Sequence, residues 1–447
     1  MSPEHIERTP EFLRAADLFE HSRKHIFLTG RAGTGKSTLL QYFRSATRHN
    51  VVVLAPTGVA AVNVRGQTIH SFFHFRPDVT PASVGDIRIR RDQRELYSKL
   101  DVVIVDEISM VRADLLDCMD LFLRRFGPDS ARPFGGIRLV LIGDLYQLPP
   151  VVTGPERDIF NGHYPSPYFF DARVFGEMDI ELVELETIWR QKEDRFIRLL
   201  NTVRDDVMSE TDFALLNSRC LPGFEPSEGE FYVYLTSTND LADDINRQRL
   251  SALSGKTFEY VGNINGKFEG RALPTQERLS LKLGAQVMLL NNDTLGRWIN
   301  GSIGVVNDII HGAAAEGGDA IRIRLAEGQE VDVTPFTWEV FRFVLNQDTE
   351  RLESEPIGSF RQYPLRLAWA VTIHKSQGKT FQKVIIDIGR GAFSHGQVYV
   401  ALSRCVSLQG IILRRPIMRR DIRLDDRVHT FLRNLKKRMR QRYPVLE

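Results

Sequence analysis

A glycine-rich segment has the residue types and spacing of a phosphate-binding loop. Gly30–Ser37 reads GRAGTGKS, fits GxxxxGK[ST], and lies between an apolar run and a helical pattern. Glycines let backbone N–H groups approach a phosphate, and the dipole of the following helix attracts anions. Lys36 is expected to bridge the β- and γ-phosphates of a nucleoside triphosphate, and Ser37 to bind Mg²⁺. The residues of this loop expected to hold the nucleotide are Gly30, Gly33, Thr34, Gly35, Lys36, Ser37 and Thr38.

Two acids directly follow another apolar run and suit metal binding and proton transfer. Asp106 and Glu107 come after Val102–Val105. Asp106 is expected to hold Mg²⁺ directly or through water, and Glu107 to take a proton from the attacking water. In the later segment GDLYQLPP, Gln147 is expected to sense the γ-phosphate, because an amide both donates and accepts hydrogen bonds. These residues predict an NTPase but do not say what hydrolysis drives.

The elements that must position these residues are short apolar runs alternating with helical patterns. Such alternation is typical of parallel sheets covered on both faces, and it predicts two α/β domains joined by a hinge at 161–167. Between the later runs, residues 255–350 show glycine-punctuated alternation, which favours short antiparallel strands inserted into the second domain. The expected parallel strands are 25–29, 51–55, 101–105 and 138–142 in the first domain, and 233–236, 384–388 and 410–413 in the second.

Composition excludes several classes of protein. With 447 residues, 42% hydrophobic and 26% charged, the chain is expected to be globular, with about three domains, rather than disordered, collagenous or coiled-coil. No apolar run approaches the roughly 20 residues of a membrane span, and the first residues carry no export signal. The three cysteines are widely separated and are expected to be reduced structural thiols. We therefore expect a cytoplasmic protein without a membrane partner.

The basic C-terminal stretch predicts an amphipathic helix over 425–442, with Val428, Phe431, Leu432 and Leu435 on one face. Two interpretations stay open. The helix docks by its apolar face and keeps its charges in solvent, or its charged face also contacts nucleic-acid phosphates.

Later segments resemble the ordered motifs of superfamily-one helicases. The stretch 115–137 resembles the signature of the Pif1 branch of that superfamily, and the resemblance covers roughly residues 20–415. The other matching segments are LAPTGVAA (54–61), GQTIHSF (66–72), LETIWRQ (185–191), AVTIHKSQG (370–378) and GQVYVALSR (396–404).

The resemblance implies an α/β fold of two RecA-like parallel-sheet lobes, with ATP between them and a small SH3-like β-barrel inserted into the second lobe. The expected boundaries are 1–182 for the first lobe, with a DNA-contacting segment at about 63–98, then 183–254 and 351–447 for the second lobe, and 255–350 for the insertion. It further implies ATP-driven movement 5′→3′ along single-stranded DNA. Such enzymes unwind duplex, forked and G-quadruplex DNA and RNA–DNA hybrids in repair, recombination and telomere maintenance. A monomer is expected on separate grounds, because the sequence shows no leftover apolar heptad or exposed apolar edge.

Residue roles carried over from the resemblance complete the expected site. Arg190 and Arg404 are expected to act as arginine fingers, which stabilise charge on the γ-phosphate from across a cleft. Gln377 and Gly378 are expected to contact the nucleotide. Hydroxyls and backbone amides suit DNA phosphates, whereas His and Phe suit stacking on bases. The expected DNA contacts are Thr57, Gly58, His70, Phe72, Thr236, His374 and Lys375.

Some alternatives stay open. The aromatic run 72–75 is also compatible with a core cluster, and residues 10–19 lack the Gln with which many superfamily-one members read adenine. Besides an autonomous helicase, the chain could be the motor subunit of a recombination nuclease, which co-purification with nuclease subunits would support. It could also be a non-catalytic single-strand-binding protein, which measured ATP turnover would exclude.

Overall fold

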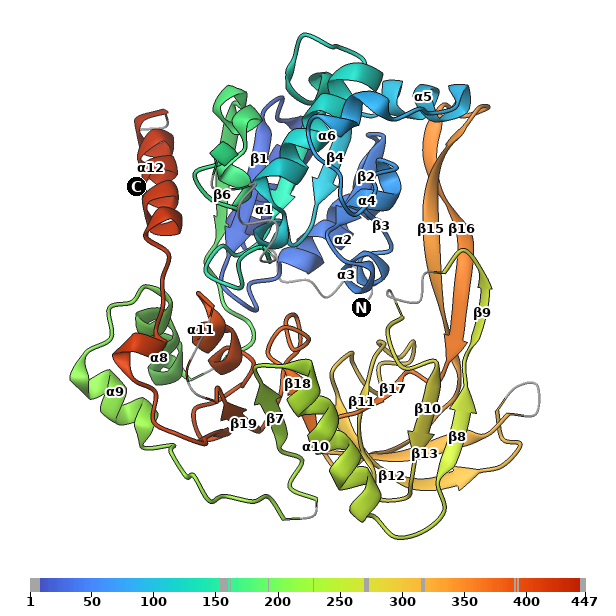
Figure 1. Cartoon of the computed structure of the whole chain (residues 1–447), viewed down its shortest axis with the longest axis vertical. Helices are drawn as coiled ribbons and strands as arrows, with labels where there is room; N and C mark the ends of the chain where they lie inside the picture. Colours follow the sequence, from blue (N-terminus) through green and yellow to red (C-terminus); the bar gives the residue numbers. More distant parts are fainter. Residues whose placement is uncertain are drawn as a thin grey trace.

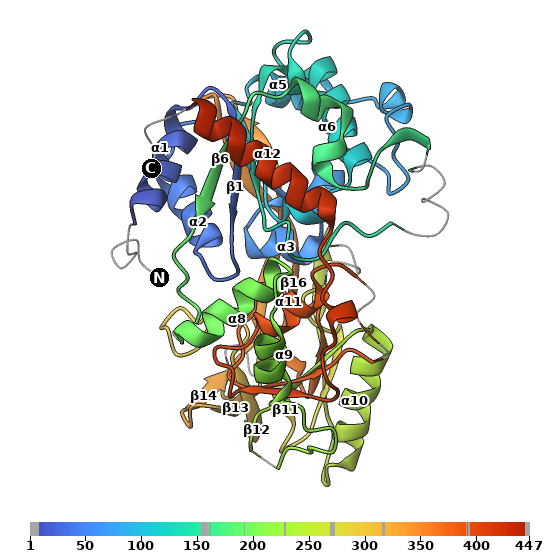
Figure 2. The same ribbon diagram turned by 90° about the vertical axis from the view of Figure 1, so that its left-hand side faces the viewer.

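The computed structural model describes residues 9–152, 160, 162–191, 193–227, 229–268, 273–314, 318–389, 391 and 394–442. Two lobes with parallel sheets lie one above the other in Figure 1, and a body of antiparallel strands lies beside the lower lobe. The chain builds the upper lobe first and the lower lobe second, and it ends in a helix that lies on the upper lobe (Figure 2).

A six-stranded parallel sheet of order β3-β2-β4-β5-β1-β6 forms the first lobe. Its strands are β1 (His25–Gly30), β2 (Val51–Ala55), β3 (Gln67–Thr68), β4 (Val102–Val105), β5 (Arg138–Ile142) and β6 (Ile180–Leu185). Its helices are α1 (Pro10–His21), α2 (Lys36–Ala46), α3 (Gly58–Asn63), α4 (Ile69–Phe72), α5 (Arg91–Ser98) and α6 (Ala113–Phe126).

Both faces of this sheet are covered, which explains why its strands are apolar at consecutive positions. In β1, Ile26 and Leu28 pack with residues of α1 and α2, whereas Phe27 packs into the cluster that contains α6. The four strands predicted for this lobe are confirmed to within one residue at each end.

The second lobe is built on a four-stranded parallel sheet of order β18-β7-β19-β20. Its strands are β7 (Val233–Thr236), β18 (Ala370–Thr372), β19 (Val384–Asp387) and β20 (Ile411–Leu413). The helices that accompany it in the chain are α8 (Asp194–Arg204), α9 (Glu210–Asn217), α10 (Asn239–Ala252) and α11 (Gln397–Leu402), followed by α12 (Asp426–Arg442).

An antiparallel body interrupts this lobe between β7 and β18. Its sheets have the orders β14-β13-β12-β11-β17, β10-β8 and β15-β16-β9. The strands run past residue 350, the boundary expected from the sequence, because β16 pairs with β15 along its length. The strands are β8 (Phe258–Val261), β9 (Asn263–Gly266), β10 (Arg278–Leu281), β11 (Gln286–Leu289), β12 (Ile303–Ile310), β13 (Ala320–Leu325), β14 (Glu330–Val333), β15 (Phe336–Asn346), β16 (Arg351–Gln362) and β17 (Leu365–Leu367).

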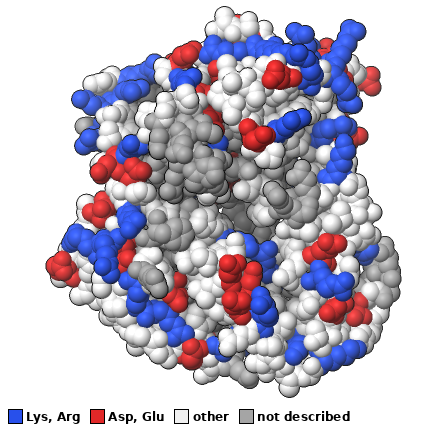
Figure 3. All heavy atoms as spheres, in the orientation of Figure 1, with Lys and Arg blue, Asp and Glu red and all other residues white. Residues whose placement is uncertain are grey.

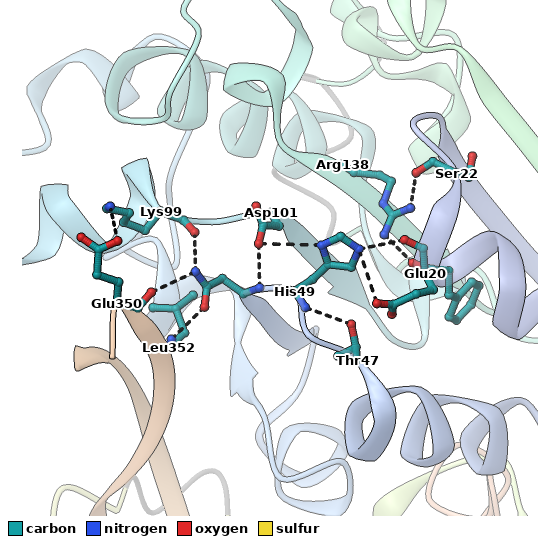
Figure 4. A network of polar contacts seen from close by, with 11 residues as sticks. Glu20, Ser22, Thr47, His49, Lys99, Asp101, Arg138, Glu350 and Leu352 are labelled. Atoms are coloured by element: carbon teal, nitrogen blue, oxygen red, sulfur yellow. Dashed lines mark hydrogen bonds and ion pairs between the residues drawn. The ribbon is translucent and has the colours of Figure 1, made fainter. Parts of the chain in front are cut away.

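The β15–β16 hairpin reaches from this body to the first lobe (Figure 1). Near its tip, Asn50 of the first lobe donates from Nδ2 to the Glu350 carbonyl at 3.2 Å and accepts from the Leu352 N–H at 3.0 Å. Lys99 forms an ion pair with Glu350 at 3.1 Å, and Figure 4 shows these contacts together. Phe343 of β15 is buried in the first lobe's core. The insertion is thereby attached to both lobes.

Helix α12 docks on the first lobe by its apolar face, which is compatible with both interpretations of its charged face. Val428, Leu432 and Leu435 are buried, and the Phe431 ring stacks on Phe170 with a centroid distance of 4.3 Å. Figure 2 shows the helix lying across β6 and β1. The C-terminal segment therefore returns from the second lobe to the first.

The hinge predicted at 161–167 is wrong. Residue 161 lies outside the described residues, but β6 follows this stretch and still pairs with β1 of the first sheet. The chain passes between the sheets only after Leu185, because α8 is the next regular element and packs in the second lobe's core. Within the described residues, no helix is long and apolar enough to cross a membrane.

Candidate nucleotide and nucleic-acid site

The phosphate loop connects the end of β1 to the start of α2. Gly33 and Gly35 have φ angles of +82° and +89°, a left-handed conformation that favours glycine. The Lys36 Nζ donates to the carbonyls of Gly30 at 2.8 Å and Arg31 at 3.0 Å, so the ammonium group lies over the loop. Burial lowers the pKa of Lys36, and the carboxylates of Asp144, Glu107 and Asp106 oppose that shift. A bound phosphate would add further negative charge beside this buried ammonium group.

Two carboxylates lie beside that loop because β4, β5 and β1 are neighbours in the sheet. Asp106 and Glu107 follow β4, and Glu107 takes a left-handed φ of 52°. Burial raises the pKa of both groups, and the Glu107 charge raises the pKa of Asp106 further. A divalent cation would relieve this repulsion. Asp106 and the exposed Ser37, the second residue of α2, carry oxygen donors of the kind that Mg²⁺ prefers.

Arg190 contacts the phosphate loop although it belongs to the link between the lobes, the segment that joins the end of β6 to the start of α8. A Cβ atom added to Gly33 would lie only 2.5 Å from the Arg190 Cβ. The Arg190 guanidinium donates to the Ser403 carbonyl at 3.2 Å, and Gln191 donates to the same carbonyl at 3.1 Å. The link is therefore held between the phosphate loop of the first lobe and the end of α11 in the second.

Arg404 is only 1% exposed and lies just past α11. Its guanidinium donates to the Val400 carbonyl at 3.0 Å, to the Ser403 hydroxyl at 2.9 Å and to the Ser376 carbonyl at 3.3 Å. Burial and the nearby Arg190 cation together lower the pKa of Arg404 to about 9, although Tyr399, Glu107 and Asp144 oppose the shift. Arg404 therefore remains a cation at neutral pH, close enough to Glu107 of the other lobe to interact with it.

Further contacts join the lobes around the loop that follows β5. The Gln377 Nε2 donates to Oε1 of the Gln147 side chain at 3.4 Å. The backbone N–H of Ala32 in the phosphate loop donates to the Tyr399 hydroxyl at 3.4 Å. Gly378 is exposed with a φ of +75°. The structure thus brings Lys36, both acids, Gln147 and both arginines to one boundary between the lobes.

The expected nucleic-acid residues fall into an accessible group and a buried group. Thr57 is exposed and caps α3 by accepting from the Ala60 N–H at 3.3 Å. His70 and His374 are half-buried, and Lys375 is exposed just past β18. Thr236 is at the end of the neighbouring strand β7, but it is fully buried and its hydroxyl donates to the Thr238 carbonyl at 3.0 Å.

Phe72 does not present its ring for base stacking in this structure. The side chain is 4% exposed and packs edge-on against Phe73, Tyr97 and Phe343. Phe73 and Phe75 belong to the same core cluster, which agrees with the alternative left open for this aromatic run. The β15 residue Phe343 completes the cluster, and it is 271 positions away from Phe72 in the sequence, so the local pattern could not reveal this packing.

Three further residues lie at this boundary, and the sequence motifs predict no role for them. Trp189 is 44% exposed, and the backbone N–H of this residue donates to the Gly33 carbonyl at 2.9 Å. Tyr399 touches the phosphate loop as described above. Arg204 is buried among the apolar residues of α8. The sequence signal for a buried Arg204 is its spacing. Arg204 follows Leu200 by four residues and Phe196 by eight, so this cation occupies a position on the apolar face of the helix.

Comparisons with known proteins agree with this geometry. Residues 13–212 match the family model of the PIF1-like helicases. The chain is 33% identical over 417 residues to the ATP-dependent DNA helicase Pif1 of Bdellovibrio bacteriovorus, covering 91% of this chain and 88% of that protein. The sequence-based prediction of an ATP-dependent DNA helicase is confirmed at the level of the family.

Solved structures agree with the fold. A Bacteroides sp. Pif1 in complex with ADP-AlF4 superposes with a TM-score of 0.87 at 35% identity, covering 97% of this chain and 98% of that one. A Bacteroides Pif1 bound to ssDNA gives a TM-score of 0.68 at the same identity and coverage. The predicted α/β fold with a RecA-like parallel-sheet core is thereby confirmed. By sequence and by fold, the chain belongs to the PIF1-like helicase family.

Proposed function

We propose that this PIF1-like helicase hydrolyses ATP with Mg²⁺ between its lobes and uses the cycle to move 5′→3′ on single-stranded DNA. Its substrates would be duplex and forked DNA, G-quadruplexes and RNA–DNA hybrids, and it would act as a monomer. The observation that carries the proposal is the position of Arg190 and Arg404, which approach the phosphate loop and Glu107 from the link and the second lobe.

Each residue of the site has a defined part in hydrolysis. Lys36 and the N–H groups of the loop would bind the phosphates, and Ser37 and Asp106 would hold Mg²⁺, whose charge would offset that of the phosphate oxygens. Glu107 takes the proton of the attacking water, because burial raises its pKa and so makes it a stronger base. The two guanidinium groups stabilise the charge that develops on the γ-phosphate.

Closure of the lobes follows from where these charges lie. ATP adds negative charge at a boundary whose second-lobe side carries cations, so binding draws the lobes together and phosphate release lets them separate. Gln147, on the loop after β5, contacts Gln377 of the second lobe. A change in the position of Gln147 on binding or release of the γ-phosphate would therefore alter a contact between the lobes. Each cycle would then move one lobe relative to the other by a step along the DNA.

DNA would be held by one set of residues on each lobe. Thr57, Gly58 and His70 belong to the first lobe, and α3 lies at the edge that faces the second lobe (Figures 1 and 2). His374 and Lys375 belong to the second. Figure 3 shows acidic and basic side chains interspersed rather than gathered in one patch, which agrees with a net charge of +2. Binding would be independent of sequence and weaken with salt.

Trp189 is proposed to stack on the adenine ring. Replacing Trp189 with Ala keeps the backbone N–H that bonds to Gly33 but removes the exposed indole, and stacking on an aromatic side chain contributes about 1–3 kcal/mol per base. We expect KM for ATP to rise about tenfold with little change in kcat. Steady-state ATPase measurements at saturating DNA test this.

The variant Trp189→Phe is the matched control, because it preserves an aromatic face and should keep most of the affinity. An unchanged KM in Trp189→Ala would show that the ring does not contact the base.

Strand separation on two duplexes tests the proposed function, one duplex carrying a 5′ single-stranded tail and the other a 3′ tail. Unwinding of the 5′-tailed duplex alone, dependent on ATP and Mg²⁺, is expected. Unwinding from the 3′ tail alone would contradict the polarity. ATP consumption without unwinding of either duplex would contradict an autonomous helicase and favour a motor subunit.

A further inference from the structure

A buried cation joins the two lobes beside the loop that follows β5. Arg204 is the last residue of α8, and its Nη2 lies 3.6 Å from Oδ1 of Asp144. The side chains are 6% and 0% exposed, respectively. The guanidinium carbon also lies 3.9 Å from the centroid of the Tyr146 ring. Both contacts lie on the first-lobe loop that carries Gln147.

This pair is not built as a fully satisfied structural ion pair. A buried charge pair stabilises a fold only when its remaining polar atoms are also hydrogen-bonded. The Arg204 Nε is buried and has no hydrogen-bond partner within the described part of the chain. Burial alone would lower the pKa of Arg204, but Asp144, Tyr399 and Tyr146 together raise the pKa above its ordinary value. The side chain is thus a permanent cation, held by the buried Asp144 of the first lobe at 3.6 Å and, more distantly, by the half-buried Asp205 next to it in the chain at 3.9 Å.

Asp144 also contacts Gln147, so it lies between Arg204 and that amide. Its Oδ1 accepts from the Tyr146 N–H at 3.1 Å, and its Oδ2 accepts from the Gln147 Nε2 at 3.2 Å. The other end of the Gln147 amide accepts from Gln377 of the second lobe at 3.4 Å. An ion pair from Arg204 to Asp144 and a hydrogen bond from Gln147 to Asp144 therefore connect Arg204 to the amide that is expected to face the γ-phosphate.

Space beside the pair lets it rearrange when the lobes move. A cavity of about 370 Å³ is lined by Arg204, Tyr146 and Asp205, and also by Arg31 of the phosphate loop. The guanidinium can therefore change its contacts without displacing core side chains, whereas the apolar neighbours on α8 cannot.

We propose that Arg204 is a positioning residue for ATP hydrolysis, which holds Asp144 from across the lobe boundary and thereby orients Gln147 toward the γ-phosphate. The inference rests on the proposed role of Gln147, and it assigns Arg204 no contact with ATP or DNA. Arg204 then differs from Arg190 and Arg404, which act on the phosphate itself.

Removing the cation tests the proposal. In Arg204→Met, we expect the kcat of DNA-stimulated hydrolysis to fall at least tenfold, while KM for ATP and the affinity for single-stranded DNA change less than threefold. Arg204→Lys, which restores a cation, should recover part of the loss. Arg198→Met is the matched control, because Arg198 is exposed on the same helix, and it should keep wild-type kcat.

A second variant separates positioning from folding. Arg204→Met leaves Asp144 buried without its partner, so the melting temperature is expected to fall. Arg204→Met/Asp144→Asn removes that buried charge and should restore the melting temperature but not kcat, because no cation from the second lobe then holds residue 144, and with it Gln147, in place. Recovery of kcat together with stability would show a structural role and overturn the proposal.

Other outcomes are equally decisive. A folded Arg204→Met with unchanged kcat, or one whose KM rises while kcat stays constant, would also overturn the proposal. The variant Gln147→Ala distinguishes this failure from failure of the proposed function. If Gln147→Ala keeps normal turnover, the γ-phosphate role of Gln147 is wrong. If it loses turnover while Arg204→Met does not, only the role of Arg204 is wrong.

Discussion

Glu107→Gln is expected to lose ATP turnover almost completely while keeping its affinity for ATP and for single-stranded DNA. The substitution preserves the size of the side chain and its ability to form hydrogen bonds, but an amide cannot take the proton of the attacking water. Loss of a general base costs about 10²–10⁴-fold in rate. The kcat of DNA-stimulated hydrolysis, measured beside equilibrium binding of a fluorescent ATP analogue and of labelled DNA, gives both halves of the prediction.

Glu277→Gln provides the matched control. Glu277 is an exposed carboxylate of the insertion, so the same chemical change there should leave turnover unaltered. Near-normal hydrolysis by Glu107→Gln would remove Glu107 as the base. Loss of nucleotide binding in that variant would mean that the carboxylate contributes mainly to metal or phosphate binding.

Arg404→Ala is expected to bind single-stranded DNA almost normally and to lose about 10³-fold in DNA-stimulated hydrolysis, the lower end of the range for arginine fingers. The guanidinium is the only part of this side chain that can reach the γ-phosphate with two donors. A pKa of about 9 keeps it charged through neutral pH, so between pH 6 and 8 the defect should not depend on pH. Steady-state ATPase assays with and without DNA measure the effect.

Because Arg404 is almost fully buried, the alanine variant also leaves a cavity, and a lysine variant separates the two effects. Arg404→Lys keeps the charge and most of the volume but lacks the forked donors, so it should melt near the wild-type temperature and still hydrolyse slowly. Arg438→Ala, at an exposed position of α12, should behave as wild type. Intact DNA stimulation in Arg404→Ala would contradict the assignment of Arg404 as a finger.

The sequence predicts the parallel sheets well because their signal is local. Val51–Ala55 is apolar at every position and Arg138–Ile142 at every position after Arg138, since helices cover both faces of the sheet. The phosphate loop is equally local, because its glycines and its lysine lie within eight consecutive residues. Elements whose signal lies within their own residues are therefore predicted to within about a residue, although their strand partners lie far away in the chain.

Contacts between distant segments could not be predicted in the same way. The pattern of α12 showed an apolar face but not that this face packs on the first lobe, and the alternation in β15 did not show that Phe343 would enclose Phe72. Arg204 carries no motif, and its importance comes only from its position opposite Asp144. Such pairings depend on how the lobes and the insertion pack together.

The distance between the lobes during the ATP cycle tests the central claim most directly. Fluorophores at Gln41 of α2 and Gln248 of α10, both exposed, would report it by energy transfer in the presence of single-stranded DNA. The lobes are expected to approach when a non-hydrolysable ATP analogue binds and to separate after hydrolysis, and Arg404→Lys is expected to close less. A distance between the two fluorophores that stays constant through binding and hydrolysis would contradict the claim that ATP binding draws the lobes together.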